Sequence, residues 1–286
     1  MKISEILAKG KPTLSFEVFP PKTADLYQSV ENAVEEIAAL KPDFMSVTYG
    51  AGGGTSDFTA SLAAEIQKKH AVTTLAHLTC VSSTKEKVEN QTALLKKEGI
   101  ENILALRGDL PEGGVLSPDY KYASQLICDL KTKGDFCIGG ACYPEGHVES
   151  RTIKDDIYYL KEKVDAGLSF LTTQMFFDNA VLYRFLYKIR EAGITVPVVA
   201  GIMPVTNANQ IKRITTLSGT YLPQRFKSIV DRFGDNRKAM EQAGIAYSTE
   251  QIIDLLANGV NAIHVYTMNK PHIAEGIQKS LSEILK

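Results

Sequence analysis

Apolar and polar side chains alternate from residue 13 to residue 19 of this chain. The apolar positions are Leu14, Phe16 and Val18, and the polar positions between them are Thr13, Ser15 and Glu17. A period of two predicts a β-strand with one apolar and one polar face, which Pro20-Pro21 ends. From residue 24 to residue 40 the apolar residues recur at helical spacing, which predicts an amphipathic helix.

The same strand–helix unit then recurs along the chain. The predicted strands cover residues 13–19, 44–49, 73–79, 102–106, 136–143, 169–174, 196–203 and 261–266. The helices after them cover residues 24–40, 56–70, 84–98, 119–133, 152–166, 180–192, 207–217 and 272–285. Left-handed caps are expected at the glycines that follow several helices, namely Gly99, Gly134, Gly167 and Gly193. A flexible loop is predicted at residues 50–54, and residues 223–259 show only a helical pattern.

Eight such units in 286 residues predict an α/β fold, a (β/α)8 barrel of the TIM type. We expect one domain over residues 1–286, with extra helices between strands seven and eight. The alternative is an open, doubly wound sheet, which usually carries G-x-G-x-x-G after its first strand. This chain has Phe19-Pro20-Pro21 there, and its glycines at 50–54 follow the second strand with a different spacing. The barrel is therefore favoured.

Composition narrows the function without identifying it. The chain has 32 Lys and Arg against 33 Asp and Glu, a net charge of −1, so no general field attracts nucleic acid or an anionic membrane. Its four cysteines form no C-x-x-C pair, which argues against a zinc site and suits reduced thiols. No signal peptide or membrane-spanning apolar run is recognisable. We expect a soluble, cytoplasmic protein.

In a barrel enzyme the active-site residues lie at the carboxyl ends of the strands. The candidates at those ends are Glu17, Thr48, His77, Arg107, Asp109, Tyr143, His147, Gln174, Met203 and Tyr266. Arg107 and Asp109 flank Gly108 after an apolar strand that Pro111 stops, and they indicate either a functional site or a salt bridge that closes the strand. The loop from Tyr143 to His147 offers an aromatic face and an imidazole, which suit a planar cofactor or simple packing.

Four candidates each have two interpretations. Glu17 is expected to point into the barrel mouth, where desolvation would raise its pKa as a general acid requires; a solvated rim carboxylate is the alternative. His77 is a hydrogen-bonded core residue or a ligand contact, with no partner at metal-binding spacing. Gln174 suits the edge of a heterocycle or holds a loop, and Lys163 meets a phosphate or lies on a solvated face. The residues alone predict a barrel enzyme with a planar, anionic ligand and one acidic catalyst.

Nine segments of the chain resemble motifs of the methylenetetrahydrofolate reductases. They are Phe16-Glu17-Val18-Phe19-Pro20-Pro21, Ser46-Val47-Thr48-Tyr49-Gly50, Ala76-His77-Leu78-Thr79-Cys80, Leu106-Arg107-Gly108-Asp109, Tyr143-Pro144-Glu145-Gly146-His147, Lys163-Val164-Asp165-Ala166-Gly167, Thr173-Gln174-Met175-Phe176-Phe177-Asp178, Gly201-Ile202-Met203-Pro204-Val205 and His264-Val265-Tyr266-Thr267-Met268-Asn269. Each motif is weak alone, but together and in order they are specific. The chain is similar to the short bacterial form, since nothing in it resembles the regulatory domain of the eukaryotic enzymes.

The resemblance implies an FAD-containing barrel that reduces 5,10-methylenetetrahydrofolate to 5-methyltetrahydrofolate with NADH or NADPH, and so supplies methyl groups for methionine synthesis. By motif, Glu17 is the acid that helps to open the imidazolidine ring, and Asp109 lies beside the flavin and faces the folate. The positions that match FAD contacts are Thr48, Tyr49, His77, Arg107, Gly108, Asp109, Tyr122, Ala123, Tyr143, His147, Asp156, Tyr159 and Lys163. Gln174, Gln210 and Lys270 match positions on the substrate side.

Two other functions remain open at this stage. One is a folate-dependent barrel transferase without flavin, and the other is a non-catalytic barrel that binds flavin or folate. The expected partners are small molecules, no metal is expected, and the resemblance implies a homo-oligomer. NADH and NADPH are not distinguished, because neither a ribose-binding acid nor an arginine for the 2′-phosphate can be located.

Overall fold

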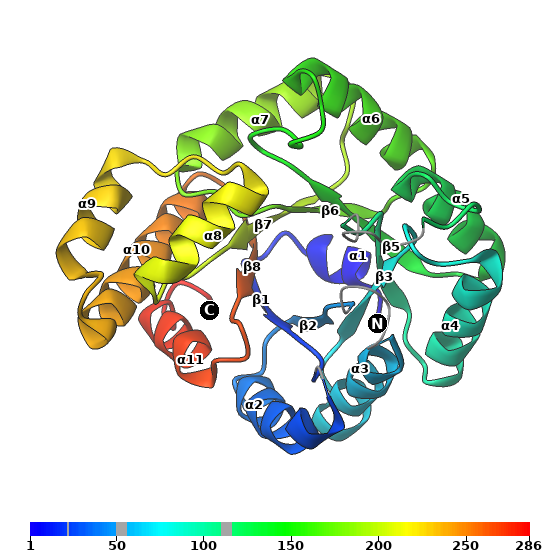
Figure 1. The fold of residues 1–286 in the computed structure, drawn as a ribbon, viewed down its shortest axis with the longest axis horizontal. Coiled ribbons are helices and arrows are strands. Elements are labelled where there is room, and N and C mark those ends of the chain that lie inside the picture. Colours follow the sequence, from blue (N-terminus) through cyan, green and yellow to red (C-terminus); the bar gives the residue numbers. More distant parts are fainter. Residues whose placement is uncertain (22, 50–55, 110–115) are drawn as a thin grey trace.

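The computed structural model describes residues 1–21, 23–49, 56–109 and 116–286. Eight parallel strands pair in chain order, and the ring closes where β1 (Thr13–Val18) pairs with β8 (Ala262–Tyr266). Helices surround this ring of strands (Figure 1). The predicted (β/α)8 barrel is confirmed. The alternative prediction of an open sheet is wrong. An open sheet would leave two edge strands unpaired, whereas here β1 pairs with β8.

The remaining elements follow the predicted order. The other strands are β2 (Phe44–Val47), β3 (Thr74–Thr79), β4 (Asn102–Leu106), β5 (Cys137–Cys142), β6 (Phe170–Thr173) and β7 (Val198–Ile202). The helices are α1 (Ile3–Leu7), the 3-10 turn η1 (Ala24–Leu26), α2 (Tyr27–Ala39), α3 (Ser56–His70), α4 (Lys85–Lys97), α5 (Ala123–Lys133), α6 (Ile153–Asp165), α7 (Asn179–Glu191), α8 (Ala208–Ser218), α9 (Gln224–Phe233), α10 (Arg237–Ala257) and α11 (Pro271–Ser280). Every predicted strand and helix is present, with its ends shifted by a few residues.

Two local features differ from the prediction. Helix α1 was not expected, because five residues are too few to show a helical period. The left-handed cap predicted at Gly134 is wrong, because its φ of 160° is extended backbone that leads toward β5. Gly99 and Gly193 do adopt left-handed conformations, with φ of 77° and 75°. The glycine loop predicted at residues 50–54 and the strand stop at Pro111 lie outside the described residues.

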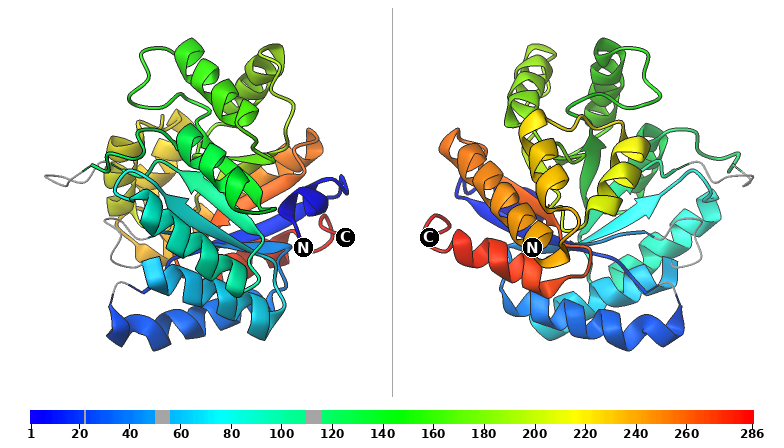
Figure 2. Two further views of the ribbon diagram at one scale, coloured as in Figure 1. Left: turned by 90° about the vertical axis from the view of Figure 1, so that its right-hand side faces the viewer. Right: turned by 60° about the vertical axis from the view of Figure 1, so that its left-hand side comes forward.

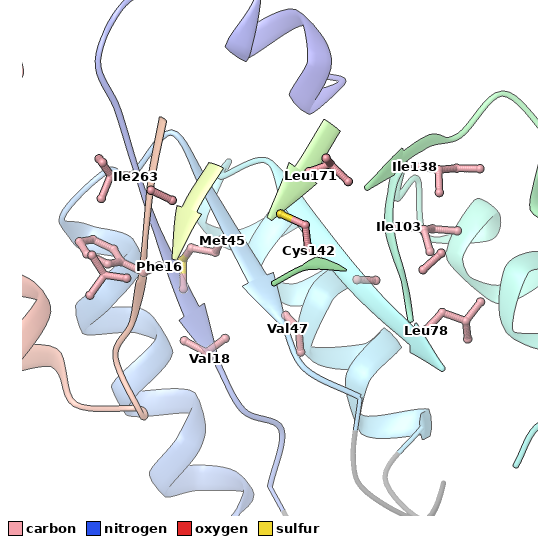
Figure 3. Close-up of a cluster of buried hydrophobic side chains, with 14 of the residues drawn as sticks. Phe16, Val18, Met45, Val47, Leu78, Ile103, Ile138, Cys142, Leu171 and Ile263 are labelled. Atoms are coloured by element: carbon pink, nitrogen blue, oxygen red, sulfur yellow. The ribbon is translucent and has the colours of Figure 1, made fainter. Parts of the chain in front are cut away.

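The apolar face of β1 packs outward against the helices, as its alternation predicted. Leu14, Phe16 and Val18 belong to one large buried cluster between the strands and the helices, whereas Ser15 and Glu17 lie on the opposite face. Members of this cluster drawn in Figure 3 include Phe16, Val18, Met45, Val47, Leu78, Ile103, Ile138, Cys142, Leu171 and Ile263. Strands buried on both faces are typical of a parallel barrel, in which side chains also fill the interior.

Helix α1 closes the end of the barrel at which the strands begin. Ile3 is fully buried against an inner cluster of strand residues, namely Phe44, Leu75, Leu104, Cys137, Phe170 and Val199. Asn102 anchors the helix, since its Oδ1 accepts from the Ile3 N–H at 2.8 Å and its Nδ2 donates to the Met1 carbonyl at 3.1 Å. Both chain ends lie at this end of the barrel (Figure 2). The opposite end, formed by the carboxyl ends of the strands, is therefore the one left for a functional site.

Helices α8, α9 and α10 lie between β7 and β8 in the chain and on one side of the barrel (Figure 1). They enclose a separate apolar cluster whose buried members are Met175, Phe177, Val205, Ile211, Phe226 and Met240. The extra helices predicted between strands seven and eight are thus confirmed. Within the described ranges, none of the helices is both long and apolar enough to cross a membrane.

Candidate active site

Glu17 projects from β1 into the interior of the barrel. In strand register it lies opposite Ser46 of β2 and Tyr266 of β8. Its side chain is about 10% exposed. The alternative interpretation of Glu17 as a solvated rim carboxylate is therefore wrong.

Burial determines the protonation of Glu17 and of its neighbour His77. Loss of hydration raises the pKa of the Glu17 carboxyl to about 8 and lowers the pKa of His77 to about 3. Both groups are therefore neutral at pH 7, although His77 Nε2 lies only 3.7 Å from Glu17 Oε2. Glu17 thus carries a proton that it can donate at neutral pH. The nearby His77 Nε2 makes no hydrogen bond within the described part of the chain.

His264 of β8 belongs to the same polar layer, although the strand-end candidates did not include it. Its Nδ1 lies 2.8 Å from Ser15 Oγ and its Nε2 lies 3.0 Å from Ser46 Oγ, and the ring stacks on Phe44 with centroids 5.6 Å apart. Burial lowers the pKa of His264 to about 3. The signal was present in the sequence, because the alternation along β8 places His264 on the same face as Tyr266.

A cavity of about 820 Å³ lies beside the carboxyl ends of β4 and β5, the first turn of α5 and one face of α6. The predicted residues that line it are Tyr49, Arg107, Gly108, Asp109, Tyr122, Ala123, Tyr143, His147, Asp156, Tyr159 and Lys163. The structure therefore brings together all the predicted cofactor contacts except Thr48 and His77. The volume falls in the range of roughly 300–1,000 Å³ that is usual for ligand sites.

Arg107 does not pair with Asp109. Its two terminal nitrogens each lie 2.6 Å from an oxygen of Glu149, which follows β5 in the chain and which sequence reasoning missed. The salt bridge suggested between Arg107 and Asp109 is therefore wrong, and Asp109 remains exposed at the cavity wall. A bidentate guanidinium–carboxylate pair is a geometry that a phosphate can also adopt with the same arginine.

Lys163 reaches the cavity from the buried side of α6. Its Nζ donates to the Ala141 carbonyl at 2.6 Å, and burial lowers its pKa. Its neighbour Lys161 instead pairs with Asp165 on the solvated face of the same helix. The solvated-face alternative is therefore wrong for Lys163.

Tyr143 and His147 form one wall of the cavity after β5. Their rings meet edge to face, with centroids 4.6 Å apart and planes at 89°. His147 Nδ1 accepts from the Glu149 N–H at 3.1 Å, and burial lowers the pKa of His147. The wall therefore presents an aromatic ring and a neutral imidazole held by the backbone.

The other predicted residues lie outside the cavity lining. Thr48 is half-buried after β2, and its carbonyl accepts from Thr59 Oγ1 at 2.9 Å. Gln174 Oε1 accepts from the Met175 N–H at 2.9 Å. Gln210 lies half-buried in the first turn of α8, and Lys270 Nζ donates to Thr206 Oγ1 at 2.9 Å. The substrate-side roles of these residues stay predictions.

Several known proteins resemble this chain over almost its full length. A curated relative from Escherichia coli (strain K12), a 5,10-methylenetetrahydrofolate reductase, is 35% identical over 273 residues, which cover 96% of this chain and 92% of the relative. A relative from Zea mays, methylenetetrahydrofolate reductase (NADH) 1, is 36% identical over 298 residues. The match covers 99% of this chain but 50% of the maize protein, so the chain spans about half the length of that relative.

A solved structure supports the fold independently. An uncharacterised protein from Clostridium thermocellum, described as binding two copies of 5-methyl-5,6,7,8-tetrahydrofolic acid, superposes with a TM-score of 0.67 over 99% of both chains. At 14% sequence identity this similarity concerns the fold alone. The family model described as methylenetetrahydrofolate reductase matches residues 2–282. Because that match spans almost the whole barrel and the bacterial relatives are covered nearly end to end, this chain belongs to the methylenetetrahydrofolate reductase family.

Proposed function

We propose that this chain is a flavin-dependent reductase that converts 5,10-methylenetetrahydrofolate to 5-methyltetrahydrofolate with NADH or NADPH. The observation that carries the proposal is a neutral, buried carboxyl at Glu17, in the barrel whose strand ends border an 820 Å³ cavity. Family membership supports the choice of folate as substrate. The reaction needs both features. The flavin that carries the hydride requires a large cavity, and opening of the imidazolidine ring of the folate requires an acid.

The cavity residues fit FAD in shape and in chemistry. Gly108 has a φ of 88°, and a Cβ there would lie 3.0 Å from Thr79 Cβ, so this position of the cavity lining favours glycine and presents backbone, with no side chain, to a ligand. Arg107, Lys163 and the first turn of α5 offer donors for a diphosphate. Glu149 and other carboxylates also line the cavity. The anion is therefore expected to be recognised by individual hydrogen bonds, with no general positive field.

When bound, FAD would supply reversible hydride acceptance between the nicotinamide and the folate. Glu17 would hold the proton that passes to a folate nitrogen as the imidazolidine ring opens. The fixed negative charge of Asp109 at the cavity wall would favour the cationic folate that results. Gln174 would offer its amide to the edge of the pterin or of the nicotinamide.

The absorption spectrum of the purified protein is the first test. Flavin absorption, or its appearance after FAD is added, would eliminate the flavin-free transferase. Bleaching by NADH without oxygen, followed by recovery with methylenetetrahydrofolate, would exclude a passive binding protein. A colourless protein that takes up no FAD would contradict the proposal.

Glu17→Gln tests the acid, because the two half-reactions require different things of it. Reduction by NADH needs no proton for a folate nitrogen, so it should stay within roughly tenfold of wild type. Reoxidation by methylenetetrahydrofolate should fall by about 10²- to 10⁴-fold, the usual contribution of a general acid. Stopped-flow traces of each half-reaction measure the two effects separately.

Glu65→Gln is the matched control. The Glu65 side chain is likewise about 10% exposed but lies on α3, outside the barrel. This variant should leave both half-reactions unchanged. Equal losses in both half-reactions of Glu17→Gln would mean that Glu17 shapes the cofactor site and does not act as the acid.

A further inference from the structure

The side chain of Arg107, in the wall of the cavity, is held by a carboxylate from the neighbouring strand end. Arg107 follows β4 and Glu149 follows β5, and these two strands pair in parallel. Arg107 Nη1 donates to Glu149 Oε2 and Nη2 donates to Oε1, both at 2.6 Å, and Arg107 Nε donates to the Gly108 carbonyl at 3.3 Å. Both residues line the cavity. These hydrogen bonds therefore fix the plane of the guanidinium group.

Glu149 is itself placed by the loop that carries it. Its N–H donates to His147 Nδ1 at 3.1 Å, and the His147 ring packs edge to face against Tyr143. Hydrogen bonding to the arginine lowers the pKa of the Glu149 carboxyl, so this group is ionised at neutral pH. Isolated ion pairs on a surface contribute little, but here both partners have further contacts and the pairing is bidentate. The pair is therefore an ordered part of the cavity wall.

The pair leaves Arg107 able to bind a ligand. A guanidinium group has five N–H donors, of which Glu149 takes one on each terminal nitrogen and the Gly108 carbonyl takes the one on Nε. One N–H on each terminal nitrogen remains, and no acceptor within the described part of the chain takes either of them. A ligand oxygen can therefore reach Arg107 while Glu149 stays in place. An anion that took both terminal nitrogens in the same bidentate geometry would instead have to displace Glu149.

We propose that Glu149 is a positioning residue that holds Arg107 in the geometry in which it binds the cofactor. This inference rests on the proposed function, because it takes FAD as the ligand of the cavity. An arginine side chain that moves freely before binding loses rotamer freedom when the ligand binds, and this loss lowers the affinity. An arginine that Glu149 already holds loses less. The contribution of Glu149 is therefore to fix the arginine in advance, although its own negative charge repels an anionic ligand.

The affinity of Glu149→Gln for FAD is the first test. The amide has one acceptor oxygen and cannot hold both terminal nitrogens of Arg107. The variant should therefore bind FAD about two- to tenfold more weakly than wild type in an equilibrium titration, the usual effect of one long side chain that binding must immobilise. Charge alone predicts the reverse, because the substitution removes a negative charge next to an anionic ligand. Unchanged or tighter binding would overturn the proposal.

Two further variants separate position from charge. Glu149→Asp keeps the charge but shortens the side chain, so it should weaken FAD binding in the same direction, and it replaces Glu149→Gln if that variant does not fold. Glu162→Gln is the matched control, since Glu162 also lines the cavity but is not hydrogen-bonded to Arg107. It should bind FAD at least as tightly as wild type. A loss as large as that of Glu149→Gln would indicate a general effect of the cavity carboxylates and would overturn the proposal.

A double-variant cycle shows whether the effect passes through Arg107. Arg107→Met keeps an unbranched apolar stem but has no N–H donors. In this background Glu149→Gln should weaken FAD binding no further. A purely structural role of Glu149 in the loop after β5 predicts a loss of the same size in both backgrounds, and that result would overturn the proposal.

A measurement before FAD is added separates this inference from the proposed function. In nitrogen-15 NMR, a guanidinium group whose rotation is slow gives resolved signals for its terminal N–H groups, and Arg107→Met identifies the signals of Arg107. Wild type should show them and Glu149→Gln should not, whereas averaged signals in wild type would overturn the inference. Resolved signals in a protein that takes up no FAD would support the positioning of Arg107 and contradict the reductase. FAD uptake with unchanged affinity in Glu149→Gln would do the reverse.

Discussion

Lys163 is the residue that best tests the cavity as a cofactor site. Its half-buried side chain lies in the cavity wall, and its ammonium group donates to the Ala141 carbonyl. Because hydrogen bonds to charged groups contribute about 1.5–3 kcal/mol, Lys163→Ala should weaken FAD binding by roughly tenfold or more. Added salt should weaken FAD binding more in wild type than in the variant, because the variant lacks the charge that salt screens. Equilibrium titration with FAD at low and high salt measures both effects.

Two further variants separate charge from packing in this prediction. Lys161→Ala removes a neighbouring lysine that pairs with Asp165 on the exposed face, and it should bind FAD like wild type. Lys163→Met keeps the buried stem and should lose FAD affinity like Lys163→Ala. Unchanged affinity in Lys163→Met would leave Lys163 a purely structural role.

The sequence predicted individual site residues where strand geometry determines their position. The period of two placed Glu17 inside the barrel, and the barrel topology brought Arg107, Tyr143 and Lys163 to one cavity. The partner of Arg107 could not be predicted, because Glu149 lies 42 residues away in a loop. Such pairings depend on how the loops fold over the strand ends, and the hydrophobic periodicity of a segment carries no information about that.

At the scale of elements, α10 packs closely against the segment after β7. Gly244 is buried in α10, and a Cβ there would lie 1.9 Å from the Val205 carbonyl oxygen. Backbone cannot move aside as a side chain can, so Gly244→Ala should destabilise the protein by about 1–3 kcal/mol or more. Urea unfolding, followed by circular dichroism, measures this loss.

Gly276 in α11 provides the control for that prediction. A Cβ at Gly276 would lie 3.5 Å from the nearest atoms of Ile245, which is ordinary contact. Gly276→Ala should therefore stabilise the protein by roughly 0.5–1 kcal/mol through helix propensity. If the Gly244→Ala variant unfolded with the same free energy as wild type, α10 would have to be able to shift away from Val205.

The elements themselves were largely predictable, and the exceptions have physical causes. Long periodic segments such as α7 and β3 appear where the pattern placed them. Helix α1 could not be predicted from the sequence. Its five residues are too few to show a hydrophobic period, and tertiary contacts of Ile3 and Asn102 stabilise the helix. Gly134 followed a helix but extends directly toward β5, so residue type alone did not decide its conformation.

At the scale of the whole molecule, three buried groups couple folding to pH in opposite directions. Burial lowers the pKa of His77 and of His264 to about 3 and raises the pKa of Glu17 to about 8. Between about pH 3 and 6.5 the unfolded chain therefore binds more protons than the native state at each histidine. Between about pH 4.5 and 8 the native state binds the extra proton, at Glu17.

Stability should consequently decline on both sides of near-neutral pH. Each histidine should cost about 1.4 kcal/mol per pH unit as the pH falls below about 6.5, since stability rises with pH where the unfolded state holds more protons. Glu17 acts in the opposite sense. Its contribution to the free energy of unfolding should decline by a similar amount per pH unit as the pH rises from about 4.5 to 8. Urea unfolding at a series of pH values measures the slopes.

Single variants assign each limb of that curve to its group. His77→Phe should flatten the acid limb, and His272→Phe, whose side chain is 54% exposed, should leave it unchanged. Glu17→Gln should remove the decline above neutral pH, because its amide has no proton to lose. An alkaline limb with the same slope in wild type and in Glu17→Gln would mean that native Glu17 ionises near its ordinary pKa. It would then hold no proton for a folate at pH 7, and the acid proposed for the reaction would have to be another group.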